Sequence, residues 1–372
     1  MTDGPVRVVF TMTFGERLGG AENMLMTFLR HVDRARLDPT VVFFARGSFE
    51  REVAALGFPT LVFEPGRFRD VHREALAIGR LARALRRLRP ELVVGWLTRD
   101  HLYVGPAAVL AGMTRRVVWW QHLLAGGRLD RVATLLPARA IGTSSHGAAV
   151  AQERLRPRRP TFTVVPGIDP PRRADPGEAA ALRESLGIPP GRVIAGNIAR
   201  LQPWKGQRLL LDAMTRLDAD VHALFVGGDA HHLAPGYGPE LRRRAAALGI
   251  EDCVTFAGHV PDPAPYLAMT DVVVNLAALE PFGIAMVEAM ALGRPVVAVD
   301  AVGPREIVAE GETGLRVDGA PDALAAGIAR LAGDPELRRR MGEAGRARYA
   351  ERFTAERMTR EIEDHVVALA RG

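Results

Sequence analysis

Two glutamates, Glu280 and Glu288, stand eight positions apart in the run Glu-Pro-Phe-Gly-Ile-Ala-Met-Val-Glu. The first precedes a Phe-Gly turn, and the second falls in an Ala/Met-rich segment that is typical of a helix. A Val-rich strand at residues 271–274 leads into the run. The backbone N–H groups at a helix start bind phosphate, and carboxylates accept hydrogen bonds from sugar hydroxyls. The pattern therefore predicts a ligand with a phosphate end and a polyol end.

Two cations, Arg200 and Lys205, follow another predicted strand at residues 193–197, within Ala-Arg-Leu-Gln-Pro-Trp-Lys-Gly. A guanidinium offers a fork of donors and an ammonium a mobile point charge, so the pair can neutralise a diphosphate. The alternative is that both are solvated surface cations in an arginine-rich chain.

The stretch from Glu280 to Glu288 closely resembles the Glu-x7-Glu signature of retaining glycosyltransferases of the family-4 type, which have the two-domain GT-B fold. The segment around Arg200 and Lys205 is similar to the family's Gly-Arg-Leu…Lys-Gly motif. The resemblance implies that Glu288 binds the ribose hydroxyls of a nucleotide and that Glu280 faces the donor sugar. It also implies that the two cations hold the pyrophosphate and stabilise the departing nucleoside diphosphate. Without the resemblance, the two glutamates would be a helix cap and a solvated face.

The resemblance also assigns backbone groups to the nucleotide. The helix start that would present its amides to the phosphate comprises Phe282, Gly283, Ile284 and Ala285. A Phe-Ala-Gly-His-Val segment matches the family's Phe-x-Gly-x-Val, whose backbone meets the nucleobase, and this implicates Gly258, His259 and Val260. We expect a UDP- or GDP-sugar as co-substrate and no cofactor, although backbone contacts do not reveal the base.

Three residues of the first half carry a similar implication. Gly19 and Gly20 belong to a Gly-Gly-Ala-Glu that follows the first predicted strand, where glycines let the chain approach a diphosphate. His122, in Trp-Trp-Gln-His, stands where the family's site histidine contacts the donor sugar; a lone histidine is more often structural. Residues 99–101, Arg-Asp-His, would either face the acceptor or form a helix cap and surface charges. The family's Pro-Asn-Gly-Val-Asp is here Pro-Gly-Ile-Asp at residues 166–169, without the asparagine.

Strand-like and helix-like segments alternate in two series, which predicts parallel β-α-β units. A proline-rich stretch at residues 156–177 separates the series. We expect an α/β fold of the GT-B type, with two Rossmann-like, doubly wound parallel-sheet domains facing an interdomain cleft. The domains are an acceptor-binding one at 1–168 and a nucleotide-sugar-binding one at 169–349, with a C-terminal helix of about residues 350–372 packing back on the first.

Composition narrows the function classes. The 372 residues hold one cysteine, no apparent signal peptide and no long apolar run, which favours a cytoplasmic protein. The net charge of +6 fits nucleic acid, an anionic membrane, a phosphorylated ligand or merely a GC-rich genome. The basic amphipathic segment 80–89 would either contact anionic lipid at the inner face of a membrane or cover a sheet with a solvated arginine face. No metal-ligand cluster is apparent, and we expect no metal and no nucleic-acid partner.

These observations predict a metal-independent, retaining glycosyltransferase that uses a front-face mechanism. Its acceptor would be the hydroxyl of a glycan, a lipid-linked molecule or a natural product. Two alternatives stay open: a GT-B relative that phosphorolyses or epimerises a sugar, and a non-catalytic basic binding protein.

Overall fold

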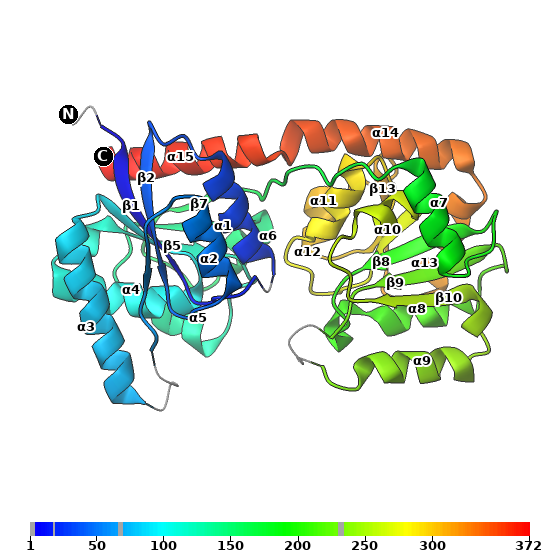
Figure 1. Cartoon of the computed structure of the whole chain (residues 1–372), viewed down its shortest axis with the longest axis horizontal. Coiled ribbons are helices and arrows are strands. Elements are labelled where there is room, and N and C mark those ends of the chain that lie inside the picture. Colours follow the sequence, from blue (N-terminus) through cyan, green and yellow to red (C-terminus); the bar gives the residue numbers. More distant parts are fainter. Residues whose placement is uncertain (1–3, 18, 66–69, 230–233) are drawn as a thin grey trace. The chain divides into compact units, whose positions relative to one another are not determined.

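The computed structural model describes residues 4–17, 19–65, 70–229 and 234–372. The chain forms two compact units (Figure 1). Unit 1 comprises Met1–Ile168 with Thr354–Gly372, and unit 2 comprises Asp169–Phe353. Each is described by itself below.

The described part of unit 1 contains a seven-stranded parallel sheet of order β3-β2-β1-β4-β5-β6-β7. Its strands are β1 Val6–Met12, β2 Leu37–Phe43, β3 Thr60–Val62, β4 Leu92–Gly95, β5 Val117–Gln121, β6 Ala140–Thr143 and β7 Thr161–Thr163. Its helices are α1 Gly20–His31, α2 Ser48–Ala55, α3 Val71–Leu88, α4 Thr98–Ala111, η1 Thr114–Arg116, α5 Arg128–Ala133, α6 His146–Glu153 and α15 Ala355–Arg371.

Helices cover both faces of this sheet, which explains why its strands are almost continuous apolar runs. Alternate residues of a strand point to opposite faces, so Phe10 joins the core under α1 and α15 while Val9 joins the core under α3 and α4. The α15 helix contributes Met358, Ile362 and Val366, spaced four residues apart on one helix face.

The described part of unit 2 contains a six-stranded parallel sheet of order β10-β9-β8-β11-β12-β13. Its strands are β8 Val193–Ile198, β9 Val221–Val226, β10 Val254–Gly258, β11 Val272–Asn275, β12 Val296–Val299 and β13 Gly314–Val317. Its helices are α7 Pro176–Ser185, η2 Pro203–Lys205, α8 Gln207–Met214, α9 Tyr237–Ala247, η4 Glu251–Cys253, α10 Ala264–Met269, α11 Ile284–Ala291, α12 Val302–Ile307, α13 Pro321–Ala332 and α14 Pro335–Arg352.

Each sheet has one point at which the strand order reverses. In unit 1 the chain builds outward from β1 to β3 and then returns to β4 on the other side of β1. In unit 2 it builds outward from β8 to β10 and returns to β11 beside β8. Loops that leave neighbouring strands in opposite directions open a crevice at such a switch point, and ligands of open α/β sheets bind there.

The predicted fold class of two Rossmann-like parallel α/β domains is confirmed. The helix expected from about residue 350 is two elements, because α14 ends at Arg352 and α15 begins at Ala355. The Thr354 side chain accepts a hydrogen bond from the Arg357 N–H and so caps the second helix. No helix of the described ranges has the length and apolarity needed to cross a membrane.

Candidate functional site

A buried ion pair spans the switch point of unit 2. Lys205, from the loop after β8, places its Nζ atom 2.6 Å from Oε2 of Glu280, in the loop after β11. The side chains are only 17% and 7% exposed. Lys205 also lies over the ring of Trp204, 4.2 Å from its centroid. Since isolated buried charges are costly, loss of either partner would leave the other charge buried and unpaired.

Lys205 is the only lysine of the chain, and all other Lys or Arg positions hold arginine. An ammonium is a mobile, compact charge that the guanidinium fork does not reproduce. The single lysine is therefore a further indication in the sequence that position 205 has a special role, and the motifs alone do not provide it.

Two buried polar side chains fix the loop that carries the cations. Gln207, with no exposed surface, donates from Nε2 to the Arg200 carbonyl at 2.9 Å. Asn197 donates from Nδ2 to the Val274 carbonyl at 3.0 Å and thereby joins β8 to β11. Sequence reasoning missed both residues; a polar side chain within a Val-rich strand and a glutamine opening a buried helix were the available signals.

The Arg200 side chain, unlike Lys205, is partly exposed and has no ion-pair or hydrogen-bond partner among the described residues. The guanidinium is therefore available to an anion outside the protein. The main chain beside it is fixed, since Leu201 N donates to the Gly228 carbonyl at 3.0 Å.

The helix start predicted at residues 282–285 is present, and α11 begins at Ile284. Gly283 caps it with φ of 108°, a conformation that favours glycine. A Cβ at this position would lie 2.3 Å from the Met286 Cε. The Glu280 carbonyl accepts a hydrogen bond from Gly303 N at 2.9 Å, which holds the turn in place. The first N–H groups of α11 lack helical acceptors, as at any helix start, and Phe282 packs beneath them in the interior.

Glu288 lies on the second turn of α11 and is largely buried, with only part of its surface reaching solvent. Burial raises the pKa of its carboxyl to about 7. Its oxygens have no hydrogen-bond partner in the ranges that the structure describes. A carboxylate without a partner accepts hydrogen bonds from ligand hydroxyls.

The turns after β9 and β10 lie at the same edge of the sheet as the loop of Arg200. Gly227 donates its N–H to the Gly258 carbonyl at 2.8 Å, and a Cβ on Gly227 would lie 2.0 Å from the Ala199 carbonyl oxygen. Beyond Gly258, His259 is exposed and Val260 packs on the apolar cluster around Ile194.

In unit 1, His122 follows β5 and is 8% exposed. Its ring packs on Trp96 with centroids 5.0 Å apart. Burial lowers its pKa to about 3, against a smaller opposing effect of a hydrogen bond with the Trp96 backbone. Its Nε2 has no partner among the described residues. The neutral imidazole suits hydrogen bonding to a ligand and is a poor base at neutral pH.

Gly19 and Gly20 lie where α1 begins, Gly19 as the extended N-cap and Gly20 as the first helical residue. The preceding loop is fixed to the start of α2, because Phe49 N donates to the Gly15 carbonyl at 2.8 Å.

The Arg-Asp-His segment opens α4 at the switch point of unit 1. The Thr13 hydroxyl, in the loop after β1, donates to Asp100 Oδ1. Asp100 has no exposed surface, and burial raises its pKa well above the usual range. His101 is equally buried and stacks on Trp119 with an interplanar angle of 4°. The alternative that these two side chains are surface charges is therefore wrong, and the alternative that they face the acceptor stays a prediction.

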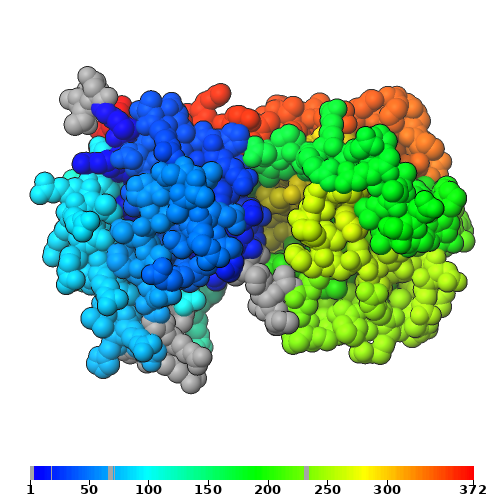
Figure 2. All heavy atoms as spheres, in the orientation of Figure 1, coloured from blue at the N-terminus to red at the C-terminus, as the bar shows by residue number. Residues whose placement is uncertain are grey.

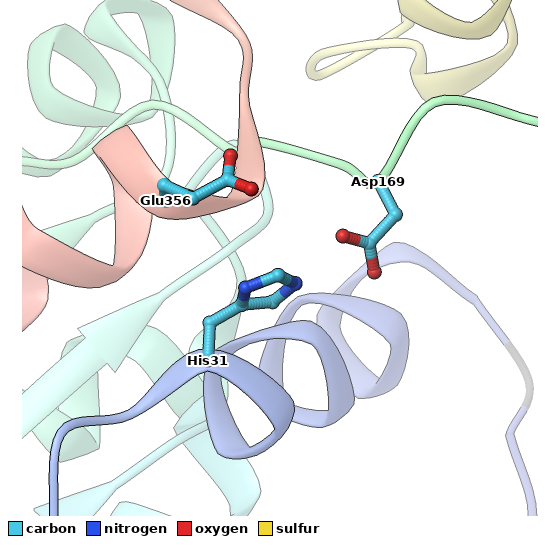
Figure 3. A group of neighbouring side chains, drawn as sticks. All are labelled: His31, Asp169 and Glu356. Atoms are coloured by element: carbon cyan, nitrogen blue, oxygen red, sulfur yellow. The ribbon is translucent and has the colours of Figure 1, made fainter.

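One group of side chains in the described ranges has the composition of a metal site. Ligand atoms of His31, Asp169 and Glu356 lie within 4.8 Å of one another (Figure 3). The two carboxylates are exposed, and exposed acidic groups commonly gather without a metal. The group includes none of the residues predicted from the sequence, and we assign it no metal.

Comparisons with known proteins identify the family of the chain. Residues 178–348 match the family model described as Glycosyl transferases group 1. The chain is 32% identical over 329 residues to the lipopolysaccharide core biosynthesis mannosyltransferase LpsB of Rhizobium meliloti. The match covers 83% of this chain and 88% of LpsB. It is 31% identical over 313 residues to a D-inositol 3-phosphate glycosyltransferase of Geodermatophilus obscurus, covering 79% of this chain and 65% of that relative. For two further relatives of that name, the chain spans 40% and 61% of their length.

Among solved structures, HepE of Anabaena in complex with UDP and glucose superposes with a TM-score of 0.84 at 26% identity. The match covers 97% of this chain and 99% of HepE. A glycosyltransferase of Rickettsia africae superposes with a TM-score of 0.85 over 99% of both chains at 16% identity, and so shows the fold alone.

Proposed function

Because the chain belongs to the glycosyl transferases group 1 family, we propose that it transfers a sugar from a nucleotide diphosphate sugar to a hydroxyl acceptor with retention at the anomeric carbon. The observation that carries the proposal is the Lys205–Glu280 pair at the switch point of unit 2, beside the start of α11. It joins a cation, a carboxylate and a helix N-terminus where a phosphorylated sugar needs all three.

In the proposed reaction, the bond between the anomeric carbon and the β-phosphate oxygen breaks through an oxocarbenium-like transition state. Arg200, Lys205 and the N–H groups of α11 stabilise the negative charge that grows on the leaving diphosphate. The acceptor oxygen forms the new glycosidic bond on the same face, and a diphosphate oxygen takes its proton. We assign charge neutralisation to these groups and therefore propose that no metal is required.

Glu288 would accept hydrogen bonds from the ribose hydroxyls, and Glu280 would face the donor sugar. Bound phosphate competes with Glu280 for the Lys205 ammonium, so the ion pair holds the cation in place before the donor binds. His122, with its neutral ring and unpartnered Nε2, would contribute a hydrogen bond to the donor sugar. Gly19 and Gly20 would admit the diphosphate close to the start of α1.

A UDP-sugar is the favoured donor, supported by the structures of HepE with UDP and with UDP-glucose, and a GDP-sugar is the alternative. The names of the relatives, an inositol-phosphate and a lipopolysaccharide-core transferase, support a hydroxyl acceptor on a polyol phosphate or a lipid-linked glycan. We place the protein in the cytoplasm, with peripheral contact to a membrane as the means of reaching a lipid-linked acceptor.

Calorimetric titration with UDP, GDP and ADP, followed by mass spectrometry of products from the matching sugars, tests this function. Glu288→Gln and Lys205→Met should each weaken nucleotide binding at least about 10-fold, because each removes a charge-assisted contact. Full nucleotide affinity in both variants would refute the site. Turnover without any acceptor, or only with free phosphate, would instead favour an epimerase or a phosphorylase.

A further inference from the structure

The positive charge of the chain is concentrated in one segment of unit 1. Residues 71–135 contain eleven arginines and four carboxylates, a net charge of +7, whereas the whole chain carries +6. The remainder of the chain is therefore nearly neutral. The segment comprises α3, β4, α4, η1, β5 and α5.

The arginines of α3 are open to solvent. Arg80, Arg83 and Arg87 are exposed and have no carboxylate partner in the part of the chain that the structure describes. Arginines of unit 2 commonly have one, as in Arg172 with Glu178 and Arg339 with Glu336. Uncompensated charge at this density attracts an anionic partner.

The same segment exposes apolar side chains. Of twelve large hydrophobic residues exposed in the described ranges, seven lie within it. Leu135 is 84% exposed, and the others are Leu76, Val109, Leu110, Leu123, Leu129 and Val132. Exposed apolar side chains at this frequency indicate an interaction surface.

The helices that carry most of these residues belong to one layer. The α3 and α4 helices share a core against Val9 and Val93, and α5 packs through Ala133 against Trp119, which projects from the same face of the sheet. The Arg86 side chain donates to the Leu110 carbonyl and joins α3 to α4. We call the outer side of this layer the α3–α5 face; α3 is visible as the cyan part of the surface in Figure 2.

We propose that the α3–α5 face docks unit 1 onto an anionic lipid bilayer. Guanidinium groups would bind lipid phosphates, and leucine and valine side chains would enter the boundary between headgroups and acyl chains. Nucleic acid fits less well, because its single strands stack on exposed aromatic rings. The one aromatic residue among those twelve exposed hydrophobics is Trp204, in unit 2.

Flotation with vesicles of phosphatidylcholine alone, and with 30 mol% phosphatidylglycerol added, tests the proposal. The wild type should float only with the anionic vesicles, and about 0.5 M NaCl should weaken binding by screening. Arg80→Glu/Arg83→Glu/Arg87→Glu should reduce binding about 100-fold or more. Val132→Ser/Leu135→Ser should reduce it even at low salt, where the charges are intact.

The matched control is Arg243→Glu/Arg330→Glu/Arg340→Glu, which makes the same charge change at exposed positions of unit 2. It should retain vesicle binding. Equal loss in this control, or equal binding to neutral vesicles, overturns the proposal. A preference for RNA over anionic vesicles also overturns the proposal. The proposal is likewise overturned if the wild type forms a dimer that Val132→Ser/Leu135→Ser dissociates, and no vesicle binding is found.

The proposal deepens the proposed function, since a lipid-linked acceptor gives the docking its purpose, but vesicle binding does not require transferase activity. Circular dichroism and UDP titration of the same variants separate the two. Wild-type UDP affinity without vesicle binding refutes the docking face alone, and vesicle binding without any nucleotide affinity refutes the proposed function alone.

Discussion

Replacing Glu288 by glutamine should stabilise the folded protein while weakening nucleotide binding. Burial raises the carboxyl pKa from an ordinary 4.5 to about 7 in the folded state. At pH 8 the wild type must therefore hold an ionised carboxylate in a site that favours the neutral acid. A pKa rise from 4.5 to about 7 corresponds to about 3 kcal/mol of unfolding free energy at pH 8.

The sign of the effect depends on pH. Below pH 4.5 the carboxyl is protonated in both folded and unfolded states, so ionisation does not distinguish wild type from variant. As the pH rises through 4.5 and on to about 7, the unfolded state loses its proton first and the wild type loses stability relative to the variant. The difference should be under about 1 kcal/mol at pH 5 and reach about 3 kcal/mol at pH 8.

Thermal and urea unfolding at pH 5 and pH 8 measure this difference. For a unit of this size, about 3 kcal/mol raises Tm by about 6–12 °C. Glu184→Gln, at an exposed position of α7, is the control and should change Tm at neither pH. A Glu288→Gln variant with wild-type or lower Tm at pH 8, or with the same shift at both pH values, would show that ionisation of Glu288 does not destabilise the fold.

The same substitution should weaken UDP binding about 10- to 100-fold, because a charge-assisted hydrogen bond contributes about 1.5–3 kcal/mol. Wild-type affinity should itself fall as the pH drops through about 7, where Glu288 takes up its proton. Opposite changes in stability and affinity are expected of a group held in place for a ligand. Isothermal titration calorimetry between pH 5.5 and 8.5 provides the measurement.

The ion pair, the histidine and the helix-cap glycine yield further predictions. Lys205→Met should lower the unfolding free energy by about 3–5 kcal/mol because it leaves Glu280 buried and unpaired, and adding Glu280→Gln should restore most of that loss in urea unfolding; equal losses in single and double variants would show that the charges do not interact. The pKa of His122 is lowered to about 3, so its ring should show no titration by NMR between pH 5 and 8. The free energy of unfolding should fall as the pH drops below 6.5, because the unfolded state then binds a proton that the folded state does not. A midpoint near 6.5 would contradict the burial of His122. Gly283→Ala should lower the free energy of unfolding more than Gly311→Ala does. Both glycines have positive φ, but only a Cβ at position 283 meets a neighbouring side chain. Equal losses in urea unfolding would indicate that the steric contact at position 283 is relieved.

Most of the fold could be predicted from the sequence because its strands and helices follow from short-range patterns of apolar, turn-forming and helix-forming residues. A Val-rich run gave β11 to within one residue, since the strand predicted at residues 271–274 is Val272–Asn275, and the Ala/Met-rich segment gave α11. Element ends were less predictable: β8 runs to Ile198, one residue past the strand predicted at residues 193–197.

The side-chain partners of the site could not be predicted, because residues far apart in the sequence meet only after the sheet has assembled. Lys205 and Glu280 lie 75 residues apart and meet only through the order of β8 and β11. Gln207 and Asn197 belong to no motif, and their role follows from burial, which a single sequence does not disclose. The full burial of Asp100 is of the same kind, since a charged type near a helix start is ordinarily exposed.

The single lysine of the chain permits a direct test of whether Lys205 holds the phosphates of a nucleotide. Reductive methylation with ¹³C-formaldehyde labels this side chain and the N-terminal amine, and titration with UDP follows both by NMR while calorimetry gives the Kd. If Lys205 holds the phosphates, the lysine methyl signal shifts and saturates at that Kd, whereas the N-terminal signal stays in place. A lysine signal that does not move while UDP binds would show that Lys205 does not contact the nucleotide.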